Sequence, residues 1–226
     1  MKSPLMAAFV AATLVFAHNA GAQNNDRYLG VGFGNASVDQ SSQFGNDDDS
    51  SSTEKVFLGF IARDAADKSG IGFEFGYIDH IDTKYAFGGS ANADIDMTSL
   101  YLAAVGTIPV FESRKSRMEL FCKLGLHSWD FEATGRGTLS GKDGDDGSDW
   151  FYGVGLDWGP VDRKGLTFRM EYEVFPAEPE VTVAGVTASR PCLLPPSGLG
   201  SCPPSLSEVK GDYEASLLIA SLIWRF

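Results

Sequence analysis

Nine consecutive residues decide the fold of this chain: Leu166-Thr167-Phe168-Arg169-Met170-Glu171-Tyr172-Glu173-Val174. Every second residue is apolar, and the residues between them are threonine, arginine and glutamate. Successive side chains of a strand point to opposite faces, whereas a helix would scatter both kinds of residue around its circumference. The stretch therefore predicts a β-strand with one apolar and one polar face.

The same alternation recurs along the chain. Apolar residues occupy every even position from Trp150 to Trp158 and again from Leu218 to Phe226. Period-two patterning bounded by turn-forming residues is the sequence signal of strands. It predicts an all-β chain of eight strands, at about residues 27–37, 54–63, 70–80, 96–109, 117–131, 149–159, 165–175 and 212–226.

The connections between these segments alternate in length. Three of them are short, at residues 64–69, 110–116 and 160–164. Strict alternation of long and short connections places all long loops at one end of an antiparallel up-and-down sheet, as in an eight-stranded β-barrel. The long connections are residues 38–53, 81–95, 132–148 and 176–211.

Hydropathy distinguishes a helical membrane protein from a barrel. The mean hydropathy is −0.08, and beyond residue 22 no stretch approaches the roughly 20 apolar residues that a membrane-spanning helix needs. A barrel could turn its apolar face inward, as soluble ligand carriers do, or outward into lipid. Trp150 and Trp158 would stand roughly 20 Å apart along a tilted strand, near the height of the apolar band of a transmembrane barrel. With the loop asymmetry, this spacing favours lipid and predicts an aromatic girdle of Trp150, Trp158 and Trp224.

The opposite face of the strands carries charges of both signs. Because the interior of an eight-stranded barrel is narrow and packed, we expect these side chains to pair inside it. The alternative is the solvated face of a soluble sheet, which would need a second layer to cover its apolar face. The predicted interior charges are Lys55, Arg63, Glu74, Arg117, Glu119, Lys123, Arg169, Glu171 and Glu173.

Several segments also carry a resemblance. Tyr28-Leu29-Gly30-Val31-Gly32-Phe33-Gly34, Trp150-Phe151-Tyr152-Gly153-Val154-Gly155-Leu156-Asp157, the nine residues quoted first and Ser221-Leu222-Ile223-Trp224-Arg225-Phe226 resemble OmpA-type eight-stranded outer membrane barrels of Gram-negative bacteria. The resemblance implies a place in the cell outer membrane among its lipids and lipopolysaccharide. It also implies that the terminal Phe226 is the signal read by the barrel assembly machinery. Because the sequence stops at Phe226, we expect the barrel domain alone, without a peptidoglycan-binding domain.

The N-terminal residues read as an export signal. Lys2 precedes an apolar stretch, and the small residues Ala20-Gly21-Ala22 follow it. This is the pattern of a secretory signal peptide over residues 1–22. The single mature domain would then be residues 23–226. In an oxidising compartment, Cys192 and Cys202 predict a disulfide across a loop rich in proline and glycine, with two free thiols or a metal pair as the alternatives.

Cys122 lies on the apolar side of its segment, where it is expected to act as a small hydrophobe. The net charge of −12 makes nucleic acid an unfavourable partner. The adjacent His127 and Ser128 would point to opposite faces of a strand and so form no catalytic dyad. His80 is expected to be solvated in a loop. The acidic run at residues 143–149 departs from the calcium-loop pattern, and we expect no cofactor and no metal site.

Three functions remain open. The first is a non-enzymatic outer membrane barrel whose external loops serve envelope integrity, adhesion or host contact. The second is a small-solute channel, suggested by the charged interior, although an eight-stranded lumen is ordinarily filled by its own side chains. The third is a lipid-modifying outer membrane enzyme.

Overall fold

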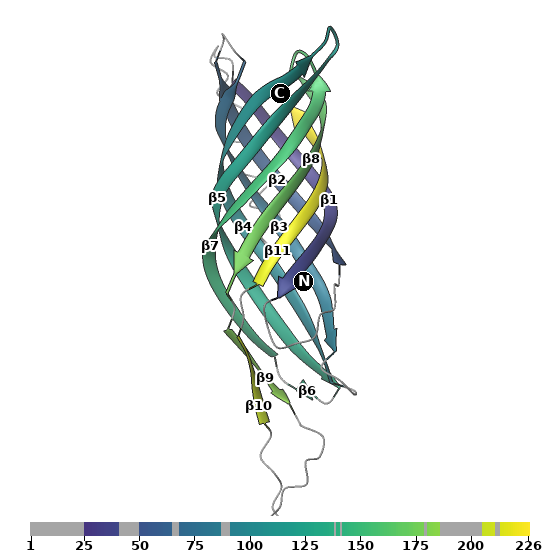
Figure 1. Cartoon of the computed structure of the whole chain (residues 1–226), viewed down its shortest axis with the longest axis vertical. Helices are drawn as coiled ribbons and strands as arrows, with labels where there is room; N and C mark the ends of the chain where they lie inside the picture. The colour runs from purple at the N-terminus through teal and green to yellow at the C-terminus, as the bar shows by residue number, and fades with distance from the viewer. Residues whose placement is uncertain are drawn as a thin grey trace, which may run out of the picture.

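The computed structural model describes residues 25–40, 50–64, 68–86, 91–137, 139–140, 142–178, 180–185, 205–210 and 213–226. Eight antiparallel strands close into one barrel in the order β1-β11-β8-β7-β5-β4-β3-β2, which confirms the predicted fold (Figure 1). Within these residues, no helix is long and apolar enough to cross a membrane. The barrel strands are β1 (Asn25–Gln40), β2 (Ser50–Arg63), β3 (Gly70–Ala86), β4 (Ala91–Glu112), β5 (Ser116–Gly137), β7 (Lys142–Pro160), β8 (Gly165–Ala177) and β11 (Tyr213–Arg225).

The two ends of the barrel differ. The turn end, at the top of Figure 1, holds the short turns and the C-terminus. The loop end, at the bottom, holds a small sheet of β6 (Leu139–Ser140), β9 (Glu180–Gly185) and β10 (Ser205–Lys210). The short turns and the long connections therefore lie at opposite ends of the barrel, as the alternation of connection lengths predicts.

The predicted limits of the long loops were too wide. The strands β3 and β4 run to Ala86 and from Ala91, so most of the predicted loop 81–95 is strand. The same holds for 132–148, where β5 and β7 continue. These extensions lie beyond the apolar belt, where neither face needs apolar residues, so the alternation that marks a strand fades there. The predicted loops 38–53 and 176–211 likewise contain strand residues.

The alternation sorts side chains as predicted along β7. Trp150, Tyr152, Val154, Leu156 and Trp158 are exposed on the outer surface, while the side chains between them face the lumen. The outer surface of the barrel is thus the apolar one. An outward apolar face suits lipid, and the closed ring of strands satisfies the backbone hydrogen bonds that lipid would leave unpaired.

Glycines make room for the aromatic rings of the interior. A Cβ atom on Gly59 would lie 2.1 Å from the Tyr28 ring, which is its direct cross-strand partner. Each ring occupies the space beside its cross-strand glycine where a larger residue would have its Cβ atom. Six such pairs occur among the described residues: Tyr28–Gly59, Phe57–Gly30, Tyr101–Gly76, Phe121–Gly155, Phe151–Gly125 and Trp129–Gly147.

Candidate functional site: the filled barrel interior

The interior has two parts. The part nearer the turn end, called here the charge network, holds all nine predicted interior charges. The part nearer the loop end, called here the aromatic layer, consists of His80, Tyr101, His127, Phe151 and Phe175, all buried. The charge network comprises Asp26, Lys55, Arg63, Glu74, Arg117, Glu119, Lys123, Asp157, Arg169, Glu171, Glu173 and Arg225.

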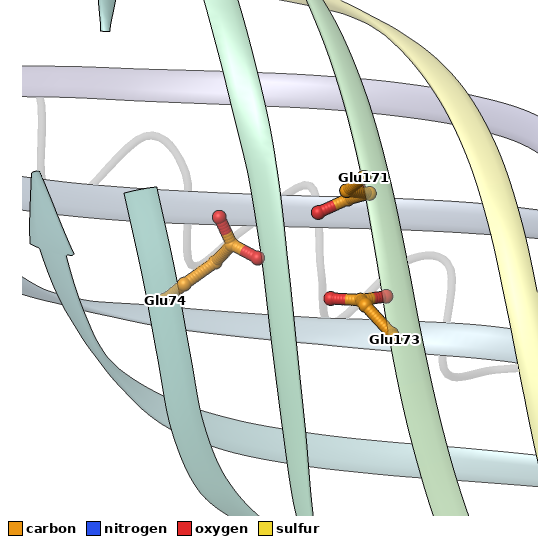
Figure 2. A group of neighbouring side chains, drawn as sticks. All are labelled: Glu74, Glu171 and Glu173. Atoms are coloured by element: carbon orange, nitrogen blue, oxygen red, sulfur yellow. The ribbon is translucent and has the colours of Figure 1, made fainter. Parts of the chain in front are cut away.

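Three carboxylates form the centre of the charge network. Figure 2 shows Glu74 of β3 facing Glu171 and Glu173 of β8, and one oxygen of each lies within 4.8 Å of the others. Carboxylates this close repel one another unless a cation lies between them. Two ammonium groups do so: Lys55 Nζ lies 2.6 Å from Glu173 Oε2, and Lys123 Nζ lies 2.6 Å from Glu74 Oε1.

The donor set of this group could serve a divalent cation, but the lysines already occupy it. Lys55 also donates to Glu171 Oε1 at 3.0 Å, and Lys123 to Glu173 Oε1 at 3.0 Å. Each ammonium therefore bridges carboxylates that would otherwise repel. The arrangement is a structural ion cluster.

Glu74 joins the two walls of the barrel. Arg169 Nη1 donates to Glu74 Oε2 at 2.6 Å, while Arg169 Nε donates to Asp157 Oδ1 at 2.7 Å. The hydroxyls of Tyr28 and Tyr101 each donate to Glu74 at 2.8 Å. Because β3 and β8 lie four strands apart in the ring of eight, the Arg169–Glu74 pair crosses the full lumen.

Glu119 organises the turn end of the charge network. Arg63 donates to both of its oxygens, at 2.6 and 2.9 Å, in the forked geometry that guanidinium and carboxylate favour. Arg117 Nη2 donates to Glu119 Oε2 at 2.7 Å, and Arg225 Nη1 does so at 3.4 Å. Asp26 accepts from Arg63 and Arg225 as well.

Three members of the network were missing from the sequence prediction: Asp26, Asp157 and Arg225. Asp157 and Arg225 alternate with Trp158 and Trp224, so strict period-two reading places both inside. Asp26 is the second residue of β1 and precedes the predicted strand start by one residue. The sequence therefore contained a signal for Asp157 and Arg225, whereas only the structure could show the place of Asp26.

The aromatic layer corrects the expectation for His80. The prediction of a solvated loop residue was wrong, because β3 continues past it and its side chain is fully buried. Its ring packs edge-on against Phe175 with centroids 4.9 Å apart. Phe151 stacks on the same Phe175 ring, with centroids 4.5 Å apart. Neither ring nitrogen of His80 has a hydrogen-bond partner among the described residues.

His127 lies in the same layer, and its neighbour Ser128 points outward as expected. A different serine approaches it: Ser99 Oγ lies 3.3 Å from His127 Nδ1, and His127 Nε2 lies 2.8 Å from the carbonyl oxygen of Pro176. The two residues are 28 positions apart, so no local motif could reveal the pair. Ser99 and His127 are each 1% exposed.

The remaining predicted site residues lie on the surface or outside the described residues. Trp150, Trp158, Trp224 and Phe226 are all exposed, more than half of each residue being accessible. Cys122 is an exposed free cysteine on the apolar outer face. The predicted signal peptide 1–22 and the predicted Cys192–Cys202 disulfide lie outside the described residues.

Comparisons with known proteins agree with this architecture. Residues 7–189 match the model of a family described as outer membrane protein beta-barrel domain. No curated protein matches the chain. The solved outer membrane protein OprG from Pseudomonas aeruginosa is similar at 16% identity and a TM-score of 0.56, over 91% of this chain and 98% of that one.

A second similar structure is Ail, the attachment invasion locus protein of Yersinia pestis. It has 13% identity and a TM-score of 0.50, over 89% of this chain and 99% of that one. Another structure of Ail holds the heparin analogue sucrose octasulfate, at 12% identity and a TM-score of 0.48, over 89% of this chain and 99% of that one. At these identities the likeness concerns the fold alone.

Proposed function

Because the chain belongs to the outer membrane protein beta-barrel domain family, we propose that it is a non-enzymatic surface-binding barrel whose loop end contacts a partner outside the cell. The chain is placed in the Gram-negative outer membrane by its family and fold. The turn end then faces the periplasm, since short turns lie there in transmembrane barrels. One observation carries the proposal: side chains close the lumen, so the barrel serves as an anchor and the loops remain for recognition.

The closed lumen argues against a channel. The Arg169–Glu74 pair spans the barrel, and Lys123 of β5 contacts carboxylates on both β3 and β8. The stacked rings of Phe151 and Phe175 fill the lumen on the loop-end side of these pairs. An ion crossing the lumen would have to break several buried ion pairs, each costly to open because a charge would be left unpaired.

The Ser99–His127 pair does not support a lipid-modifying enzyme. A nucleophile and base must meet their substrate, and lipid lies on the outer face of the barrel, whereas both residues are buried inside it. The exposed Ser128 faces outward without a histidine on its own face. The geometry therefore favours binding over catalysis.

Charge indicates the kind of partner. The four predicted long loops contain 13 acidic and 5 basic residues, whereas the three short turns contain 4 acidic and 5 basic ones. An acidic loop end attracts cationic surfaces and repels polyanions. The partner proposed for this chain is thus a basic surface, unlike the sulfated analogue bound by Ail.

Phe226 completes the proposal as the signal for the assembly machinery. Its ring is exposed at the turn end, and its backbone N–H donates to the Arg27 carbonyl at 3.1 Å, which fixes the chain end against β1. Trp150, Trp158 and Trp224 are the proposed girdle, with the lipids and lipopolysaccharide around them as partners.

The test compares two charge-neutralised variants of equal charge change. One replaces Asp47, Asp48 and Asp49, within the predicted long loop 38–53, with asparagine. The other replaces Asp64, Glu112 and Asp162 at the turn end with their amides. Binding to polylysine-coated and heparin-coated surfaces is measured with the protein in phosphatidylcholine nanodiscs.

We expect the loop variant to lose binding to polylysine, the turn variant to keep it, and neither to bind heparin. Equal binding by both variants would overturn the proposed basic partner. Discrete conductance of the unmodified protein in planar bilayers would favour the channel instead, and heat-modifiable mobility on gels checks that each barrel has folded.

A further inference from the structure

The turn-end mouth of the barrel contains buried hydrogen-bond donors without acceptors. Arg117 Nη1, Arg163 Nε and Arg225 Nε are all buried and have no partner among the described residues. Arg117 and Arg225 are themselves only 4% and 2% exposed. A buried donor with no acceptor costs free energy, so each of these donors indicates an acceptor that is not yet accounted for.

Positive charge is in excess at this mouth. Four guanidinium groups, those of Arg63, Arg117, Arg163 and Arg225, converge there and are called here the mouth arginines. All four lie near Glu119, and Arg63 and Arg225 also contact Asp26. Asp157 also accepts from Arg225, but Arg169 holds it through two further bonds.

The centre of the network shows no such excess of positive charge. Lys55 and Lys123 lie among three carboxylates, and Arg169 supplies the remaining cation from the turn-end side. Because Arg169 is committed in this way, none of the central carboxylates is left to compensate the mouth. Arginines therefore outnumber the carboxylates that they contact at the end of the lumen that faces the periplasm.

Arg163 closes over the mouth from the turn between β7 and β8. Its Nη2 atom donates to the carbonyl of Lys68 at 3.4 Å, across to the turn that follows β2, and lies 4.0 Å from Glu119 Oε1. Burial, followed by the field of Arg63, lowers the pKa of its guanidinium below the usual value. The side chain is thus held near other cations by the fold, with 18% of it exposed.

We propose that the mouth arginines form a binding site for a phosphate-type oxyanion at the periplasmic end of the barrel. Guanidinium groups present rigid forks of N–H donors that match the oxygens of phosphate, and their charge strengthens each bond. The free donors of Arg117, Arg163 and Arg225 supply three such contacts from β5, the β7–β8 turn and β11. A bound anion would satisfy these donors and offset the excess charge.

The site is tested with inorganic phosphate on the folded protein in zwitterionic detergent. Ligand that binds only the folded state raises the unfolding temperature along a saturating curve. We expect phosphate to do so relative to chloride at equal ionic strength. A shift that matches chloride, or that never saturates, would overturn the site.

Two variants locate the effect. Arg163→Gln removes a donor from the turn while Glu119 keeps its bonds to Arg63 and Arg117, so this barrel is expected to fold. Arg117→Gln removes a donor from β5. Each is expected to weaken the apparent phosphate affinity at least about tenfold, as loss of a charge-assisted hydrogen bond does.

Arg114→Gln is the matched control, because it removes the same charge from an exposed position in a neighbouring turn. Its phosphate affinity is expected to equal that of the unmodified protein. Unchanged affinity in Arg163→Gln would contradict the proposal, and this variant decides the matter if Arg117→Gln fails to fold.

The phosphate could come from free anion in the periplasm or from the headgroup of an inner-leaflet lipid. Nanodiscs of phosphatidylcholine alone, with inorganic phosphate added, test the first source. Nanodiscs containing phosphatidic acid, without added phosphate, test the second. Stabilisation that depends on Arg163 in either arm supports the site and names its source, whereas stabilisation in neither arm overturns it.

Discussion

The two halves of the barrel interior are held together by different kinds of interaction. Near the turn end, the charge network holds six acidic and six basic side chains that bond across the lumen. Near the loop end, the aromatic layer packs rings against rings, and the His80 imidazole has no hydrogen-bond partner among the described residues. The first half depends on the identity of each partner, and the second depends on shape.

This difference predicts in which half a substitution should destabilise the barrel more. Removing one member of a buried ion pair leaves the other charge unpaired in a medium of low dielectric constant. Replacing a ring by another ring of similar volume preserves most contacts. A substitution of the same size should therefore cost much more in the charge network than in the aromatic layer.

The largest effect is expected at Glu74. Glu74→Gln keeps the shape of the side chain but leaves Arg169 and Lys123 without their shared carboxylate. We expect a loss of about 3–5 kcal/mol in the free energy of unfolding, the usual cost of breaking a buried pair. Denaturant unfolding followed by tryptophan fluorescence measures it.

Glu54→Gln is the control for that experiment. Glu54 is exposed on β2, and its replacement is expected to change the free energy of unfolding by less than about 0.5 kcal/mol. Similar losses in the two variants would show that the charge network does not depend on its individual pairs.

An intermediate effect is expected at a glycine beneath a ring. Gly59→Ala places a methyl group 2.1 Å from the Tyr28 ring, and the ring must move away from Glu74, to which its hydroxyl donates. Overpacking of this kind costs about 1–3 kcal/mol. The same unfolding assay applies, and assembled barrel can be quantified by heat-modifiable mobility.

Gly106→Ala provides the contrast, because its new methyl group would make only an ordinary contact with Cys122 Sγ at 3.5 Å. We expect it to be nearly neutral. Equal destabilisation by both changes would mean that loss of backbone freedom, rather than space for the ring, explains the glycines of this barrel.

Much of this interior could be predicted from period-two alternation. Lys55, Glu171 and Glu173 lie inside because every second residue of a tilted strand must do so. Alternation names the face of a residue but not its partner, so nothing in the sequence indicated that Arg169 reaches Glu74 rather than Glu171. Partners across the lumen depend on the ring order of the strands and on their stagger.

His80 shows where the reading failed. Its parity in β3 matches that of Glu74, so strict alternation through the predicted strand 70–80 would have placed it inside. The polar residues Asp79 and Asp82 around it suggested a loop, because the strand leaves the apolar belt there. Hydropathy marks the membrane band of a strand, and this strand runs further than the band.

The smallest effect distinguishes two histidines within the aromatic layer. His80→Phe removes two nitrogens that have no partner and keeps a ring against Phe175, so the free energy of unfolding should stay the same or rise. His127→Phe loses the contacts with Ser99 and the Pro176 carbonyl. Since a net hydrogen bond contributes about 0.5–1.5 kcal/mol, and Ser99 would be left buried without its partner, we expect a loss of about 1–2 kcal/mol. If both variants lose stability equally, His80 holds a bound group that satisfies its nitrogens, and the layer would then depend on partner identity as the charge network does.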